Sequence, residues 1–194
     1  MKKALVLFIL CFLSFTTAFS QEDFYQKLAE KALTLTEDNV TYDPSYFSLS
    51  YPNGDVPADK GVCTDVVIRA YRKMKIDLQK EVHEDMKANF TRYPNIWGLT
   101  RPDTNIDHRR VPNLMVFFER FGSVLPITPE ARDYAPGDIV CWNLGGAVTH
   151  IGIISAKKSI IGQRPLIVHN IGAGQVLQDC LFDYKIIGHY RYGK

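Results

Sequence analysis

The order of apolar and polar positions divides the chain into a helical first part and a strand-rich second part. Phe24, Leu28 and Leu35 recur at helical spacing, which predicts an amphipathic helix over residues 21–37. Further helices are predicted over residues 62–75, 79–90 and 113–121. From Pro136 onward, short β-branched and aromatic runs alternate with Gly, Pro, Asn and Lys, which is typical of strands. The expected strands cover residues 138–143, 150–155, 166–170 and 185–192.

Helices followed by strands predict a single α+β domain, with N-terminal helices packed on a C-terminal antiparallel sheet. Residues 39–60 and 93–112 are polar and contain several prolines, so both are expected to be long connections. Long connections inside compact domains are often functional. No linker signal divides residues 21–194, which therefore read as one domain.

Residues 1–20 have the pattern of a cleaved signal peptide. Lys2 and Lys3 precede an apolar run over residues 4–15, and residues 18–20 form a small-x-small cleavage site. The run is shorter than the roughly 20 residues that a spanning helix needs, so no stable membrane anchor is expected. We expect an exported protein, periplasmic or extracellular, that begins near Gln21.

Charge and cysteine content narrow the possible functions. The formal net charge of +2 falls to about zero without Lys2 and Lys3, so no basic field favours nucleic acid as a partner. Three cysteines follow the signal peptide, and an odd number leaves at least one free thiol. Cys141 and Cys180 stand in apolar strand-like runs and are interpreted as small buried side chains, with a disulfide between them as the alternative.

The remaining cysteine, Cys63, opens the predicted helix over residues 62–75. Val66 and Val67 share its helix face, so the thiol is expected to point toward the rest of the domain. Unpaired amides and the helix dipole in the first turn stabilise a thiolate. This placement suits a nucleophile, although a buried structural cysteine is an equally supported interpretation from the helix alone.

Two histidines in consecutive predicted strands are the candidate partners of this thiol. His150 begins its strand, and Gly152 on the same face is expected to make room for the Cys63 helix. The next strand carries His169 and Asn170 on opposite faces. A base needs a third polar group to orient its imidazole, and the register of the sheet decides which of these two residues serves.

The segments at residues 61–65, 136–140, 150–153 and 168–169 resemble the NlpC-type papain-like peptidases of bacterial cell-wall turnover. A wider match resembles the bacterial family called domain of unknown function 1287. Its segments lie at residues 61–71, 105–111, 167–172 and 188–192. The resemblance implies a papain-like fold of the NlpC type without a cofactor. It implies Cys63 as nucleophile, His150 as general base and His169 as the orienting residue.

One departure from the NlpC pattern concerns the substrate pocket. Those enzymes usually carry Asp-Cys-Ser-Gly around the thiol, whereas this chain has Val62-Cys63-Thr64-Asp65. Asp65 is expected to cap the helix or to contact the substrate. Asn170 is a further candidate for substrate contact if it does not orient the base.

A run of charges in the middle connection is the other candidate for substrate binding. Arg109 and Arg110 suit carboxylates, and peptidoglycan stem peptides are acidic, so the two arginines are a possible substrate clamp. The alternative is an internal salt-bridge cluster that fixes the loop through Asp107 and Asp103.

Three functions remain open on the sequence. The first is an exported cysteine amidase or endopeptidase acting on cell-wall peptides or another small amide. The second is an acyl hydrolase or transferase acting on lipids from the same scaffold. The third is a non-enzymatic module that holds zinc through Cys63, His150 and His169. No C-x-x-C or H-E-x-x-H spacing supports the third, so no metal is expected.

Overall fold

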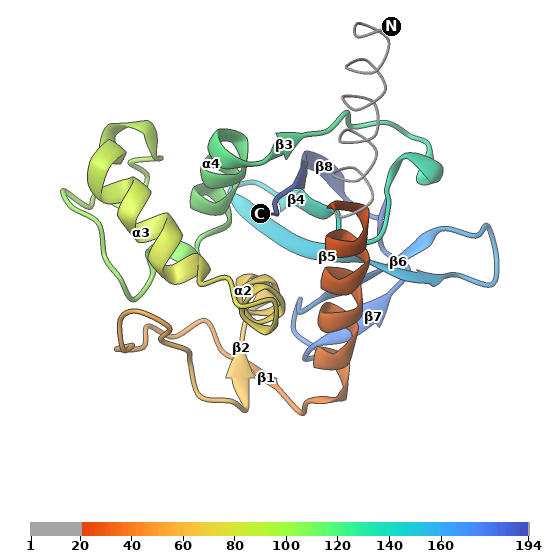
Figure 1. Ribbon diagram of the computed structural model, residues 1–194, viewed down its shortest axis with the longest axis horizontal. Helices are drawn as coiled ribbons and strands as arrows, with labels where there is room; N and C mark the ends of the chain where they lie inside the picture. Colours follow the sequence, from red (N-terminus) through yellow and green to blue (C-terminus); the bar gives the residue numbers. More distant parts are fainter. Residues whose placement is uncertain (1–20, 194) are drawn as a thin grey trace, which may run out of the picture.

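Helices lie on one side of a single antiparallel sheet in the computed structural model, which describes residues 21–193 (Figure 1). The predicted signal peptide therefore falls outside the described residues. A helix over residues 21–34 is followed along the chain by three others. These are α2 (Cys63–Lys73), α3 (Leu78–Asn89) and α4 (Val111–Phe121).

The sheet has six strands in the order β3-β8-β4-β5-β6-β7, and every neighbouring pair is antiparallel. It is not a simple meander, because the last strand returns to lie between β3 and β4. The strands are β3 (Ser123–Val124), β4 (Ile139–Gly145), β5 (Val148–Lys158), β6 (Pro165–His169), β7 (Val176–Gln178) and β8 (Lys185–Arg191). The prediction of an α+β fold with an antiparallel sheet is confirmed.

The shortest elements are those that the apolar pattern did not predict. Within the expected loop over residues 39–60, β1 (Thr41–Tyr42) and β2 (Lys60–Gly61) pair in parallel. Helix α4 begins two residues before its predicted start, because Pro112 stands in its first turn, where no amide hydrogen is needed. Residues 21–193 also form four 3₁₀ turns. They are η1 (Leu35–Glu37), η2 (Phe90–Arg92), η3 (Asp107–Arg109) and η4 (Ala131–Asp133).

The two faces of the sheet belong to different apolar clusters. Alternate residues of β4 and β5, among them Cys141, Ile151 and Ile153, pack under the helices. The residues between them, such as Trp142 and Ile154, join a smaller cluster on the other face. His150 alternates with Ile151, so its side chain belongs to the face away from the helices.

A Pro-Gly-Asp turn before β4 ties the sheet to both ends of the described chain. Gly137 has a φ of +85°, and a Cβ there would lie 2.3 Å from the carbonyl oxygen of Tyr25. The Asp138 carboxylate is fully buried. It lies 2.8 Å from His189 Nε2 and accepts a hydrogen bond from Arg191 Nε at 2.5 Å. Because β8 supplies both partners, Asp138 holds the turn against that strand.

The cysteines and helices of the described residues bear on two further expectations. Cys63, Cys141 and Cys180 are all free and buried, so the alternative of a Cys141–Cys180 disulfide is wrong for this structure. Among residues 21–193, no helix combines the length and the apolar character that crossing a membrane requires.

The Asp138 contacts give a stability prediction. Asp138→Ala should lower the free energy of unfolding by about 3–5 kcal/mol, because it leaves buried polar partners without their acceptor. Asp179→Ala is the matched control, since Asp179 pairs with the partly exposed Arg164 and should cost at most about 1 kcal/mol. Urea denaturation of both variants measures the difference. Equal losses would contradict this account of the turn.

Candidate active site

Cys63 is the first residue of α2, and its side chain reaches the level of the sheet. The residue is 8 % exposed. Backbone amides of Cys63 itself, Thr64 and Ile151 donate toward its sulfur. A strand amide points within the plane of its sheet, so the sulfur lies level with β5 rather than above one face. Helix α2 packs against β5 and β6, which brings the thiol beside the strand that carries His150.

The two predicted histidines lie in direct contact. His150 Nε2 and His169 Nδ1 are 2.8 Å apart, and the rings meet edge to face. Both side chains are almost fully buried. The Trp142 ring lies against His150, with 5.8 Å between the ring centroids. His150 Nε2 is thus committed to His169, which leaves Nδ1 as the ring nitrogen for another partner.

Gly152 makes room for β6 and not for the Cys63 helix, so that part of the sequence-based expectation is wrong. A Cβ at Gly152 would lie 2.7 Å from Ile167 Cγ2 and 3.2 Å from His169 Cβ. The Cys63 helix packs on the opposite face of β5, in the cluster that contains Ile151. The glycine therefore permits the close approach of Ile167 and His169 from β6.

Asn170, the alternative orienting residue, faces the helix side of the sheet. Its Nδ2 donates to the carbonyl oxygen of Gly61 at 3.1 Å, and its Oδ1 accepts from the amide of Gly172. The register thus places His169, and not Asn170, against His150. Asn170 holds the residues that lead into Cys63, and its polar atoms are occupied within the protein.

The far nitrogen of His169 has partners that the sequence did not suggest. His169 Nε2 lies 3.2 Å from Gln178 Oε1 and 3.6 Å from Cys180 Sγ. Strand β7 carries Gln178 opposite Ile167, one diagonal position from His169. This strand has three residues and no alternating pattern, so the periodic pattern of the sequence could not predict it.

Burial disfavours the thiolate form of Cys63 and the protonated form of His150. It raises the pKa of the Cys63 thiol to about 12. Burial, followed by the neighbouring His169, lowers the pKa of His150 to about 3. Burial thus favours a neutral thiol and a neutral imidazole.

A groove of about 500 Å³ opens at Cys63. Tyr42 of β1 lies in its wall, and sequence reasoning missed this residue because β1 has only two residues. The Arg110 guanidinium stacks over the Trp97 ring at 4.1 Å from its centroid. The other lining residues are Pro44, Val62, Ile96, Ile106, Arg109, Val111, Pro112, Ala147 and Thr149.

Asp65 and Arg109 bind each other, in contrast to the substrate contacts predicted for them. Arg109 Nε and Nη2 donate to the two Asp65 oxygens at 2.9 and 3.0 Å, with both side chains almost fully buried. Asp65 Oδ2 also accepts from the Val62 amide and so caps α2, as one of its predicted roles required. An internal salt-bridge cluster is therefore present: Arg109 pairs with Asp65, which the sequence did not predict, and Arg110 pairs with the predicted Asp107 at 3.9 Å.

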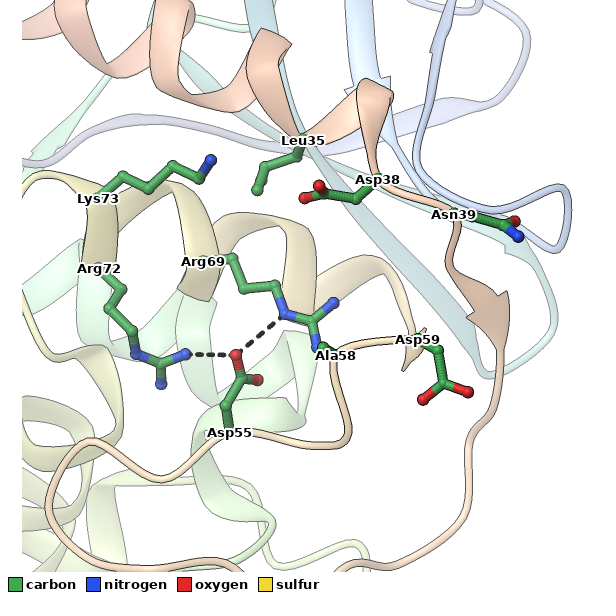
Figure 2. Close-up of a pocket in the computed structure, with 9 residues that line it drawn as sticks. All are labelled: Leu35, Asp38, Asn39, Asp55, Ala58, Asp59, Arg69, Arg72 and Lys73. Atoms are coloured by element: carbon green, nitrogen blue, oxygen red, sulfur yellow. Dashed lines mark hydrogen bonds and ion pairs between the residues drawn. The ribbon is translucent and has the colours of Figure 1, made fainter.

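A second pocket, of about 540 Å³, lies toward the other end of α2. Figure 2 shows Asp55 between the guanidinium groups of Arg69 and Arg72, at 3.1 and 2.7 Å. None of its lining residues is a cysteine or a histidine. The groove at Cys63 is therefore the candidate active site.

Cys63, His150 and His169 are the zinc ligands of the non-enzymatic alternative. Within residues 21–193, no group of three or more His, Cys, Asp or Glu side chains has an arrangement that could hold a metal ion. The 2.8 Å contact between His150 and His169 occupies one nitrogen of each ring.

Residues 29–192 match the family described as Domain of unknown function (DUF1287). The chain belongs to this family. It is also 51% identical over 165 residues to the uncharacterized protein YijF of Escherichia coli (strain K12). That alignment covers 85% of this chain and 80% of YijF.

Two solved structures, NlpC1 and NlpC2 from Trichomonas vaginalis, show a distant similarity of fold. NlpC1 is 14% identical with a TM-score of 0.47, and the match covers 87% of this chain and 44% of NlpC1. NlpC2 is 16% identical with a TM-score of 0.43, and the match covers 86% of this chain and 47% of NlpC2. The chain thus spans less than half the length of either solved chain.

The buried histidines predict how stability depends on pH. Burial lowers the pKa of both His150 and His108 to about 3, whereas a histidine in the unfolded chain titrates near 6.5. Between these values the unfolded chain binds more protons, so stability falls as the pH falls from about 6.5 toward 4. Each histidine contributes a slope of about 1.4 kcal/mol per pH unit.

Asp107 changes the pH dependence of stability in the opposite direction. Burial raises the pKa of its carboxyl to about 6, so between about pH 4 and 6 the folded chain binds the extra proton and gains stability as the pH falls. Single variants separate these contributions. His150→Leu and His108→Leu should each flatten the stability curve by about 1.4 kcal/mol per pH unit between pH 4 and 6. Urea denaturation across this range measures the slopes. An unchanged slope in His150→Leu would show that His150 is charged in the folded protein.

Proposed function

We propose that the chain is a cysteine hydrolase, an amidase or endopeptidase, that cleaves amide bonds in peptidoglycan stem peptides. The observation that carries the proposal is the His150–His169 contact of 2.8 Å on β5 and β6, the two strands against which the Cys63 helix packs, together with the open groove at Cys63. A buried cysteine or a strand histidine is common singly. A nucleophile, a base and an orienting group placed together are the requirement for covalent catalysis.

The proposed reaction begins with proton transfer from Cys63 Sγ to His150 Nδ1, while His169 holds the opposite ring nitrogen. The thiolate attacks the carbonyl carbon of the scissile amide. The resulting oxyanion is stabilised by the backbone amide of Cys63, since amides in the first helical turn have no intrahelical partner. His150 then gives its proton to the departing amine as the carbon–nitrogen bond breaks.

The second half of the reaction releases the acyl group. Water gives a proton to His150 and attacks the thioester that joins the acyl group to Cys63. The carbon–sulfur bond breaks, Cys63 regains the proton, and a carboxylic acid product leaves. The sum is hydrolysis of one amide to an acid and an amine, which needs no cofactor.

Arg110 supports an acidic substrate. Of the two predicted clamp arginines, Arg109 is bound by Asp65, whereas Arg110 lies in the groove over Trp97 with Asp107 Oδ1 3.9 Å from its Nη1. A guanidinium held flat by an aromatic ring can bind a carboxylate with two hydrogen bonds. Stem peptides carry such carboxylates. Export, predicted from residues 1–20, would bring the chain to the cell wall.

The nucleophile is tested with Cys63→Ala. Mass spectrometry of purified muropeptides before and after incubation should show products that gain one water with the unchanged chain. Cys63→Ala should lower the rate by at least about 10³-fold, as loss of a covalent nucleophile does. Cys141→Ala, a buried cysteine under the helices, is the control and should keep the activity. Cleavage by Cys63→Ala would contradict the proposal, and turnover of acyl esters alone would favour the lipid hydrolase.

The carboxylate site is tested with Arg110→Gln. We expect kcat/KM on a stem peptide to fall by about 10–100-fold, because a charge-assisted hydrogen bond contributes about 1.5–3 kcal/mol. An analogue whose carboxylates are amidated should show almost no difference between the two proteins. Arg101→Gln, an exposed arginine of the same connection, is the matched control. Equal losses on both substrates would rule out carboxylate binding by Arg110.

A further inference from the structure

His150 and His169 share a single proton across their contact, and its position decides whether His150 can act as a base. Both rings are buried, and burial lowers the pKa of each, so both are neutral near pH 7. In a neutral pair, one ring must donate and the other accept across the 2.8 Å contact. Two arrangements satisfy this condition, and they are chemically different.

In the first arrangement His150 carries its proton on Nε2 and donates it to His169 Nδ1. His150 Nδ1 then has a free lone pair that can take a proton. His169 must carry its own proton on Nε2. In the second arrangement each proton lies on Nδ1, so His150 carries N–H at Nδ1 and has no lone pair there.

The choice is made at the far nitrogen of His169. Gln178 Oε1 lies 3.2 Å from Nε2, and a carbonyl oxygen can only accept, so it requires the proton on Nε2. Cys180 Sγ, at 3.6 Å, is the competing partner. Burial raises the pKa of Cys180 to about 12, so its thiol keeps its proton and can donate to an unprotonated Nε2. The two neighbours thus favour opposite arrangements.

We infer that Gln178 is a positioning residue that sets the tautomers of His169 and His150 so that Nδ1 of His150 stays unprotonated. The inference rests on the proposed function for its catalytic consequence, but the tautomers themselves are a property of the protein without substrate. Gln178 does not touch the reacting atoms and acts through His169. Cys180, which contacts the same His169 nitrogen, favours the opposite tautomers.

Three variants separate this role from a structural one. Gln178→Glu keeps an acceptor and should keep the tautomers. Gln178→Leu removes the acceptor and leaves the Cys180 thiol as the partner of Nε2, so the Nδ1–H forms should dominate. The double variant Gln178→Leu with Cys180→Ala removes both partners and should recover part of the Nε2–H forms. A general loss of packing would not be relieved by a second truncation.

The direct measurement is long-range ¹H–¹⁵N NMR of the ¹⁵N-labelled chain without substrate, which assigns the protonated nitrogen of each histidine. We expect Nε2–H on both residues in the unchanged chain and in Gln178→Glu, and Nδ1–H in Gln178→Leu. Unaltered tautomers in Gln178→Leu, or Nδ1–H in the unchanged chain, would overturn the inference.

Activity provides the second measurement. Muropeptide turnover should fall by about 10–100-fold in Gln178→Leu, as for other residues that orient a functional histidine. It should rise again in the double variant and stay near the original rate in Gln178→Glu. If neither the unchanged chain nor any variant cleaves muropeptides, the proposed function fails. The NMR result still decides the tautomers in that case. Equal turnover in Gln178→Glu and Gln178→Leu would contradict the role of the acceptor.

Discussion

The approach of the α2 start to the backbone of β5 is the contact on which the rest of the site depends. The Ile151 amide donates toward the Cys63 sulfur, so the thiol stands level with the sheet. Helices cover one face of that sheet, and the histidine pair belongs to the other. A thiol held above either face would meet only one of these layers. Held level with the strand, the thiol receives the amides of the helix start, and the proposed base belongs to the strand beside it.

Buried charges hold this approach in place. Asp65 caps α2 and binds Arg109, which links the helix start to the turn at residues 107–109. Asp138 fixes the strand side in the same way, through two partners on β8. Breaking either group would leave a charge without its partner in a poorly solvated position. These carboxylates therefore hold the elements on either side of the site in place.

Long-period patterns were predictable from the sequence, and short elements and pair geometry were not. The four main strands, the Cys63 helix and the separation of His169 from Asn170 follow from helical and alternating spacing. Strands of two or three residues carry no measurable period, so Tyr42 of β1 and Gln178 of β7 escaped detection. The pairing of Arg109 with Asp65 was not predicted either, because residues 44 positions apart meet only in the folded chain.

The central claim is that His150 and Cys63 act as one unit, and the reaction of Cys63 with iodoacetamide tests it most directly. Intact-mass kinetics at pH 7 followed by peptide mapping need no knowledge of the substrate. We predict that Cys63 is alkylated well before Cys141 and Cys180, and that His150→Ala slows its alkylation at least about tenfold, since the thiolate is the reacting species. Alkylation of Cys63 at the same rate in both proteins would show that His150 does not activate the thiol.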